Sequence, residues 1–94
     1  MSELINNKIL NQYQTKIAKH TASVEYSIQD KKIFLGKTII PDSFTEQETN
    51  IFIQNILDDC ISQKLRIVPI SSIVVKFIKN NKEYKEHLSA GIRI

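Results

Sequence analysis

The sequence predicts a mixed α/β (α+β) domain: an antiparallel three-stranded meander, one main helix, a strand joined in parallel and a short C-terminal helix. Residues 13–28 alternate apolar and polar side chains, as strands with one buried face do. Residues 45–64 carry one apolar stripe at helical spacing. A short apolar strand at residues 65–70 follows directly, and the order strand, helix, strand favours a parallel crossover.

The N-terminal part of the chain supplies the first two strands of the meander. Residues 1–12 are rich in Asn, and their apolar spacing fits either a short helix or an arm laid on the sheet. Residues 13–17 and 22–28 follow as strands, and we expect the bend between them at residues 19–21. The polar residues 29–32 form the next turn.

The third strand is expected at residues 33–40. Its apolar residues run together, which predicts burial on both faces of the sheet. Gly36 within it indicates a bulge or a close approach of another backbone. Pro41 ends the strand.

The main helix begins with residues suited to capping its first turn. Thr45 and Glu48 have the spacing of a capping box, and Ser43 with Glu46 is an alternative frame. The stripe expected to face the core consists of Phe52, Ile53, Ile56, Leu57 and Cys60. Asp58 and Asp59 are expected on the exposed side.

The C-terminal part supplies one strand and one short helix. The strand at residues 65–70 leads into Ser71 and Ser72, which are expected to cap a helix over residues 73–80. Tyr84 is expected either in the core or beside a substrate cleft. Lys76, Lys79, Lys82 and Lys85 recur every third residue, and we interpret them as a solvated basic face.

Length and composition indicate one domain, residues 1–94, that acts in the cytoplasm. The net charge of +3 comes mainly from lysine, which favours anionic ligands weakly. Arg66 and Arg93 are the only arginines, so a nucleic-acid partner is not expected. The single cysteine, Cys60, fits a reducing compartment. No signal peptide or membrane span is expected. The oligomeric state is left open.

Three stretches in order resemble a known family. They are Lys-Thr-Ile-Ile-Pro-Asp-Ser-Phe at residues 37–44, Leu-Arg-Ile-Val-Pro-Ile-Ser at 65–71 and Asn-Asn-Lys-Glu-Tyr at 80–84. Together they are similar to the small, single-domain members of the GCN5-related N-acetyltransferases, in the YjdJ-like branch. The resemblance covers about residues 13–88. It implies acetyl-CoA or CoA as the cofactor and a small-molecule or protein amine as the substrate.

The resemblance also implies roles for particular residues. Ile39 and Ile40 would offer backbone groups to the pantetheine arm, and Ser71 would stand where the family has a catalytic Cys. Thr38 and Tyr84 would border the substrate cleft. The cofactor phosphates would lie near Gln47, Glu48, Thr49, Asn50 and Lys76.

The start of the main helix departs from the family pattern. The family's phosphate loop is rich in glycine, whereas residues 45–50 read Thr-Glu-Gln-Glu-Thr-Asn. Glycine allows close approach of backbone to phosphate, and the carboxylates of Glu46 and Glu48 would repel a diphosphate. The sequence therefore predicts weakened cofactor binding and weakened or lost activity. It leaves open a second function, a non-catalytic module that binds a protein or small ligand in the same cleft.

The other reactive side chains carry no further site. Cys60 is expected to be a buried, unreactive thiol. His20 is expected in a turn and His87 near the end of the chain, each without a catalytic partner. Two His and one Cys at scattered spacing make no metal site.

Overall fold

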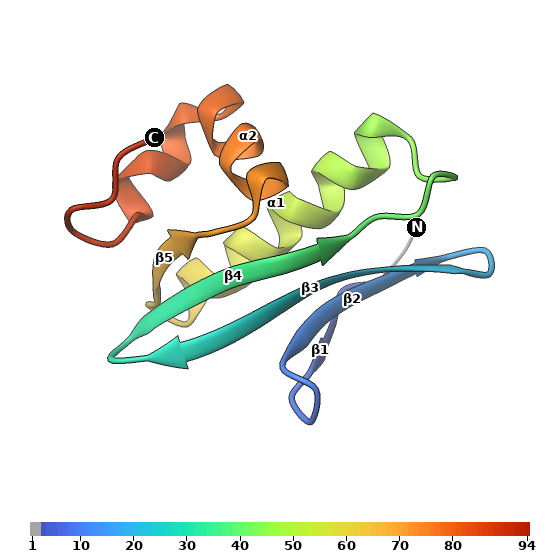
Figure 1. Cartoon of the computed structure of the whole chain (residues 1–94), viewed down its shortest axis with the longest axis horizontal. Coiled ribbons are helices and arrows are strands. Elements are labelled where there is room, and N and C mark those ends of the chain that lie inside the picture. The colour runs from blue at the N-terminus through green and yellow to red at the C-terminus, as the bar shows by residue number, and fades with distance from the viewer. Residues whose placement is uncertain (1–2) are drawn as a thin grey trace.

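A computed structural model describes residues 3–94, and its fold class is the predicted one. Figure 1 shows a single five-stranded sheet, in the order β1-β2-β3-β4-β5, with both helices on one face. The strands are β1 (Ile5–Asn7), β2 (Gln12–Ile17), β3 (His20–Gln29), β4 (Lys32–Ile39) and β5 (Arg66–Pro69). The helices are α1 (Glu46–Ser62), α2 (Ser72–Asn80) and the 3-10 helix η1 (Lys82–His87). Within residues 3–94, no helix is long and apolar enough to cross a membrane.

The meander is antiparallel and has an additional edge strand. Of the two alternatives for the first residues, the arm on the sheet is correct, because β1 pairs with β2; residues 1–2 lie outside the described part. The predicted bend at residues 19–21 is right at Lys19 but wrong at His20 and Thr21, which already belong to β3. The turn comes earlier, at Ala18 with φ 55°, so that His20 already pairs with Ile17. The predicted turn at residues 29–32 is confirmed.

The third predicted strand, β4, is buried on one face only, which corrects the prediction of burial on both. Ile33 and Leu35 are fully buried, whereas Phe34 between them is partly exposed. The reason is that the helices cover one face of the sheet and none covers the other (Figure 1). The bulge predicted at Gly36 is confirmed, because Gly36 and Lys37 together lie opposite Glu25 of β3.

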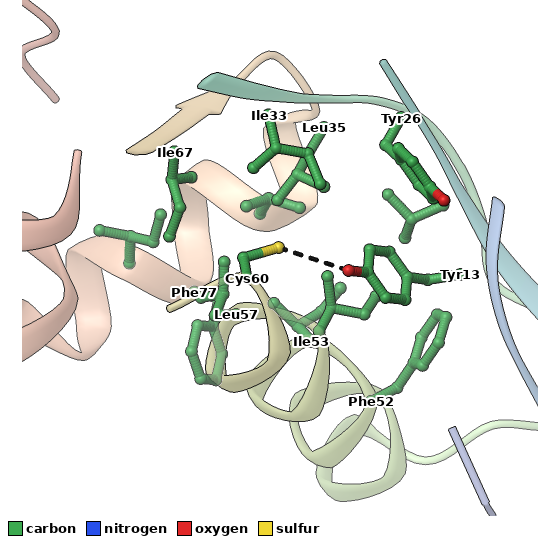
Figure 2. Close-up of a cluster of buried hydrophobic side chains, with 14 of the residues drawn as sticks. Tyr13, Tyr26, Ile33, Leu35, Phe52, Ile53, Leu57, Cys60, Ile67 and Phe77 are labelled. Atoms are coloured by element: carbon green, nitrogen blue, oxygen red, sulfur yellow. Dashed lines mark hydrogen bonds between the residues drawn. The ribbon is translucent and has the colours of Figure 1, made fainter. Parts of the chain in front are cut away.

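Helix α1 joins β4 to β5 in the predicted parallel crossover. Thr45 Oγ1 accepts the Glu48 N–H at 3.0 Å and Glu48 Oε1 accepts the Thr45 N–H at 2.9 Å, so the capping box is confirmed. The five residues of its apolar stripe are all buried. Figure 2 shows several of them packing against β2, β3 and β4 in one continuous core.

The C-terminal region packs back on β5. Helix α2 ends at Asn80, as predicted, and η1 follows as a separate 3-10 helix. The four regularly spaced lysines lie on these two elements, and all four are exposed, as the interpretation of a solvated face predicts. Arg66 donates to the carbonyls of Glu86 and Leu88 at 2.9 and 2.6 Å, and this fastens the last turn to the edge of the sheet.

Candidate functional site

The two parallel strands separate halfway along their length. β4 pairs with β5 as far as Leu35, whose partner is Pro69. The carbonyl of Leu35 accepts the N–H groups of both Ile70 and Ser71, at 2.9 and 3.0 Å. The chain then turns into α2, so the second half of β4 has no strand beside it. An opening forms between this half of β4 and the start of α2.

The bulge decides which backbone groups of β4 face that opening. Tyr26 N–H bonds to Asn11 O on the β2 side. Because strands alternate, Val24 also turns its backbone groups toward β2, and its partner Thr38 turns away from β3. Ile39 pairs with Ser23 and faces β3. The backbone groups of Thr38 and Ile40 therefore face the opening, and those of Ile39 do not.

Two hydroxyl groups meet across the opening. Thr38 Oγ1 donates to Ser71 Oγ at 2.7 Å and lies 3.0 Å from the carbonyl oxygen of Gly36. Ser71 Oγ also accepts the Ile73 N–H at 3.3 Å, so its predicted capping of α2 is confirmed. Ser71 Oγ thus accepts hydrogen bonds from a hydroxyl and from an amide N–H. Neither is a base that would activate a serine as a nucleophile.

The opening continues into a cleft of about 260 Å³ on the helix side. Four predicted site residues border it, namely Ile40, Thr49, Asn50 and Lys76. The rest of the cleft wall consists of Glu46 and of four residues that the sequence patterns did not identify: Phe44, Ile73, Phe77 and Asn80. Phe44 directly precedes Thr45, the cap of α1, and Ile73 and Phe77 are four apart on α2; these spacings could have identified them. Gln47, Glu48, Thr38, Ile39 and Ser71 do not border the cleft.

The N-terminus of α1 opens onto this cleft. The capping box occupies the N–H groups of Thr45 and Glu48. Within the described chain, the N–H groups of Glu46 and Gln47 have no protein acceptor. The same turn carries the carboxylates of Glu46 and Glu48, and Lys76 faces the cleft from α2. Local donors that favour an anion thus lie beside charges that oppose one.

Tyr84 lies outside the cleft, behind its wall. Its ring packs on Phe77, with 5.6 Å between ring centroids, and its hydroxyl donates to Asp58 at 2.8 Å. Burial, followed by the hydrogen bond to Asp58, raises the pKa of Tyr84 to about 12. Asp59 accepts the Tyr13 hydroxyl at 2.7 Å. The prediction of exposure is confirmed for Asp58, which is exposed although it is hydrogen-bonded, and is wrong for Asp59, which is partly buried.

Of the other reactive side chains, Cys60 is buried as predicted, whereas His20 is not where the sequence placed it. Cys60 is fully buried, and burial raises the pKa of its thiol to about 12. His20 begins β3 rather than lying in the turn, and His87 lies 3.4 Å from Glu86 at the end of η1. In the part of the chain that the structure describes, no group of His, Cys, Asp and Glu could hold a metal ion.

Comparison with known proteins points to one family. A family model described as GCN5-related N-acetyl-transferase matches residues 12–88, from the first residue of β2 to just past η1. Searches of curated proteins and of solved structures each find no match. The matched segment includes the separated strands, the helix-side cleft and the start of both helices. The chain therefore belongs to the GCN5-related N-acetyltransferase family.

Proposed function

We propose that this protein transfers an acetyl group from acetyl-CoA to an amine, as a cytoplasmic enzyme of the YjdJ-like branch. The observation that carries the proposal is the separation of β4 from β5, with the Thr38 and Ile40 backbone groups turned into the opening. An extended arm with amide groups can pair with such a free strand edge. The family resemblance supports the same choice of ligand.

The residues at the cleft fit the pantetheine arm and one phosphate better than a full diphosphate. Phe44, Ile73 and Phe77 offer an apolar wall to the arm. The free N–H group of Glu46 would hold a phosphate at the cleft, with the neighbouring free N–H group of Gln47 beside it and Lys76 supplying positive charge. Thr49 and Asn50 would add polar contacts from the next turn of α1. Acetyl-CoA supplies an activated acyl carbon in a thioester.

Ser71 is the residue that we propose to act at the thioester. Its hydroxyl stands at the inner end of the opening and is held by Thr38. Because no base contacts it, we assign it a hydrogen bond to the departing sulfur rather than nucleophilic attack. Ile39 would then support the arm only by packing, since its backbone groups pair with Ser23.

An NMR titration of the labelled protein with CoA and acetyl-CoA tests the proposal. We expect amide shifts at Thr38, Ile40, Glu46 and Gln47, and weak binding caused by the carboxylates. Glu46→Gln removes one of these charges and should raise CoA affinity roughly two- to fivefold. Glu86→Gln, on η1, is the matched control and should leave affinity unchanged. If these amides show no chemical-shift change up to millimolar CoA or acetyl-CoA, acetyl-CoA is excluded as the ligand.

One observation favours a second function, a non-catalytic binding module. The capping box occupies the N–H groups of Thr45 and Glu48, which leaves fewer free donors for a diphosphate at the start of α1. A module of this kind would bind a protein or small ligand in the same cleft without acetyl transfer. Saturable CoA binding together with acetylation of an amine would reject this alternative.

A further inference from the structure

A second hollow lies on the sheet face that no helix covers. Its volume is about 230 Å³, and its lining includes Glu25, Ser27, Phe34, Gly36, Lys37 and Ile70. Val24, Ile33 and Leu35 are buried beneath the helices. Because side chains alternate along a strand, Glu25 and Phe34 project from the opposite face. Figure 1 shows that face free of other elements.

This hollow lies beside the point where β4 and β5 separate, as the helix-side cleft does. Gly36 directly follows Leu35, the last residue of β4 that pairs with β5. Ile70 directly precedes Ser71, the residue that we propose to act at the thioester. The hollow and the cleft therefore lie on opposite faces of the sheet beside one opening. A ligand in the hollow would approach the inner end of that opening from the uncovered face.

The hollow offers two opposite charges beside an apolar wall. Glu25 lies across the bulge from Gly36 and Lys37. No ion pair within 4.0 Å joins Glu25 to Lys37 in the described structure, whose one such contact is His87 with Glu86. Both charges are thus available to a ligand. Phe34 is partly exposed and Ile70 is 63% exposed, so the apolar wall is also uncovered.

We propose that this hollow binds the acetyl acceptor, and that the acceptor is a small apolar α-amino acid. Its amino group would pair with Glu25, its carboxylate with Lys37, and its side chain would lie on Phe34 and Ile70. The inference rests on the proposed acetyl transfer, because it places the acceptor at that site.

The reaction balances without a further reactant. The ammonium group first loses a proton to water. The amine nitrogen then attacks the thioester carbonyl, and the C–N bond forms as the C–S bond breaks. The nitrogen releases its second proton and the thiolate takes one up. The products are the N-acetyl amino acid, CoA and one net proton.

Three related compounds test the proposal, with acetyl-CoA as the donor. They are L-leucine, leucinamide, which lacks the carboxylate, and 4-methylpentanoate, which lacks the amine. We expect L-leucine to shift the amides of Glu25, Gly36 and Ile70 and to be acetylated. Leucinamide should be acetylated with about tenfold lower kcat/KM, because it lacks the charged contact to Lys37. 4-Methylpentanoate should inhibit weakly.

Two variants and one control locate the effect. Lys37→Gln should remove the preference for L-leucine over leucinamide. Glu25→Gln should lower kcat/KM about tenfold for both amines. Lys16 is an exposed lysine on β2 outside the hollow, and Lys16→Gln should change neither the preference for L-leucine nor kcat/KM. CoA affinity should be the same in all three variants, which separates the acceptor site from the donor site.

The outcomes distinguish failure of this inference from failure of the proposed function. If acetyl-CoA binds but L-leucine causes no shift in the hollow and is not acetylated, the amino-acid acceptor is wrong and acetyl transfer stands. If Lys37→Gln leaves the preference for L-leucine intact, the assignment of the carboxylate is wrong. If acetyl-CoA does not bind, the proposed function fails, and the acceptor assignment fails with it.

Discussion

Two adjacent residues of α1, Asp59 and Cys60, show how a buried polar contact is built into an apolar stripe. The Tyr13 hydroxyl donates to Asp59 at 2.7 Å and lies 3.8 Å from Cys60 Sγ, the contact dashed in Figure 2. Burial, followed by the charges and hydrogen bonds of these two residues, raises the pKa of Tyr13. Tyr13 can therefore lie in the core because its one polar atom has a partner.

Cys60 should be protected from alkylation in the folded protein. With a pKa of about 12, its thiol holds almost no thiolate at pH 8, and it is fully buried. We expect iodoacetamide at pH 8 to label the protein only at the rate of unfolding, and quickly in urea. Mass spectrometry measures the label. Fast labelling of the native protein would contradict the placement of Cys60.

Tyr13→Phe should lower the free energy of unfolding by about 0.5–1.5 kcal/mol, because it removes one buried hydrogen bond. Asp59 keeps a second donor, Gln63 Nε2 at 2.7 Å, so the larger cost of an unpaired carboxylate is avoided. Tyr84→Phe is the matched control, since its bond to Asp58 is exposed and should contribute less. Urea unfolding measures the free energy of unfolding of both variants. An equal loss of stability in the two would argue against burial as the reason that the Tyr13 bond contributes more.

At the scale of elements, the start of α1 combines two roles that compete. The capping box stabilises the helix through Thr45 and Glu48, and both first-turn carboxylates favour the positive end of the helix. The same groups oppose an anionic ligand at the cleft. The sequence pattern predicted the box, because capping depends on residues three positions apart in one chain.

Thr45→Ala should destabilise the protein by about 1 kcal/mol through loss of the cap. It also frees the Glu48 N–H, so CoA affinity should hold or rise while stability falls. Thermal unfolding and the CoA titration measure the two effects. Ser62→Ala is the control, because Ser62 Oγ donates only to a helix carbonyl at the other end of α1, outside the cleft. A parallel fall in stability and affinity would show that the cap helps the ligand.

At the scale of the molecule, one core joins the sheet and both helices. The ionisation of groups that pack in or against this core therefore affects the free energy of unfolding of the whole protein. All three tyrosines and the single cysteine have a raised pKa, in each case mainly through burial. The folded state therefore favours the neutral form of each group. Each contributes stability that is complete below its ordinary pKa and is lost as the pH rises through the folded value.

The free energy of unfolding should consequently fall as the pH rises above about 9, where the unfolded thiol begins to ionise. The fall should steepen from pH 10 toward 12, where an unfolded tyrosine ionises and the folded Tyr84 still holds its proton. Urea titrations at pH 8, 10 and 11, followed by circular dichroism, measure it. Tyr84→Phe should flatten the slope; constant stability up to pH 11 would contradict the raised pKa values.

The sequence by itself determined the main elements and their order, from the second strand to α2. Alternation at residues 13–28, the apolar stripe of α1 and the cap at Thr45 are local patterns, and strand, helix, strand implied the parallel join. It also offered the bulge as one of two alternatives at Gly36. These features could be predicted because their physical causes act between near neighbours in the chain. The four predicted residues of the cleft wall came instead from the family resemblance, because they lie on separate elements.

Only the tertiary structure decided which faces are covered and which groups meet. The apolar run in β4 predicted two buried faces, and the positions of the helices left one open. The register across the bulge turned Thr38 rather than Ile39 toward the opening. Tyr84 and Asp58 are 26 residues apart and bond only because η1 folds back on α1. Such contacts depend on packing between distant segments, which no local pattern encodes.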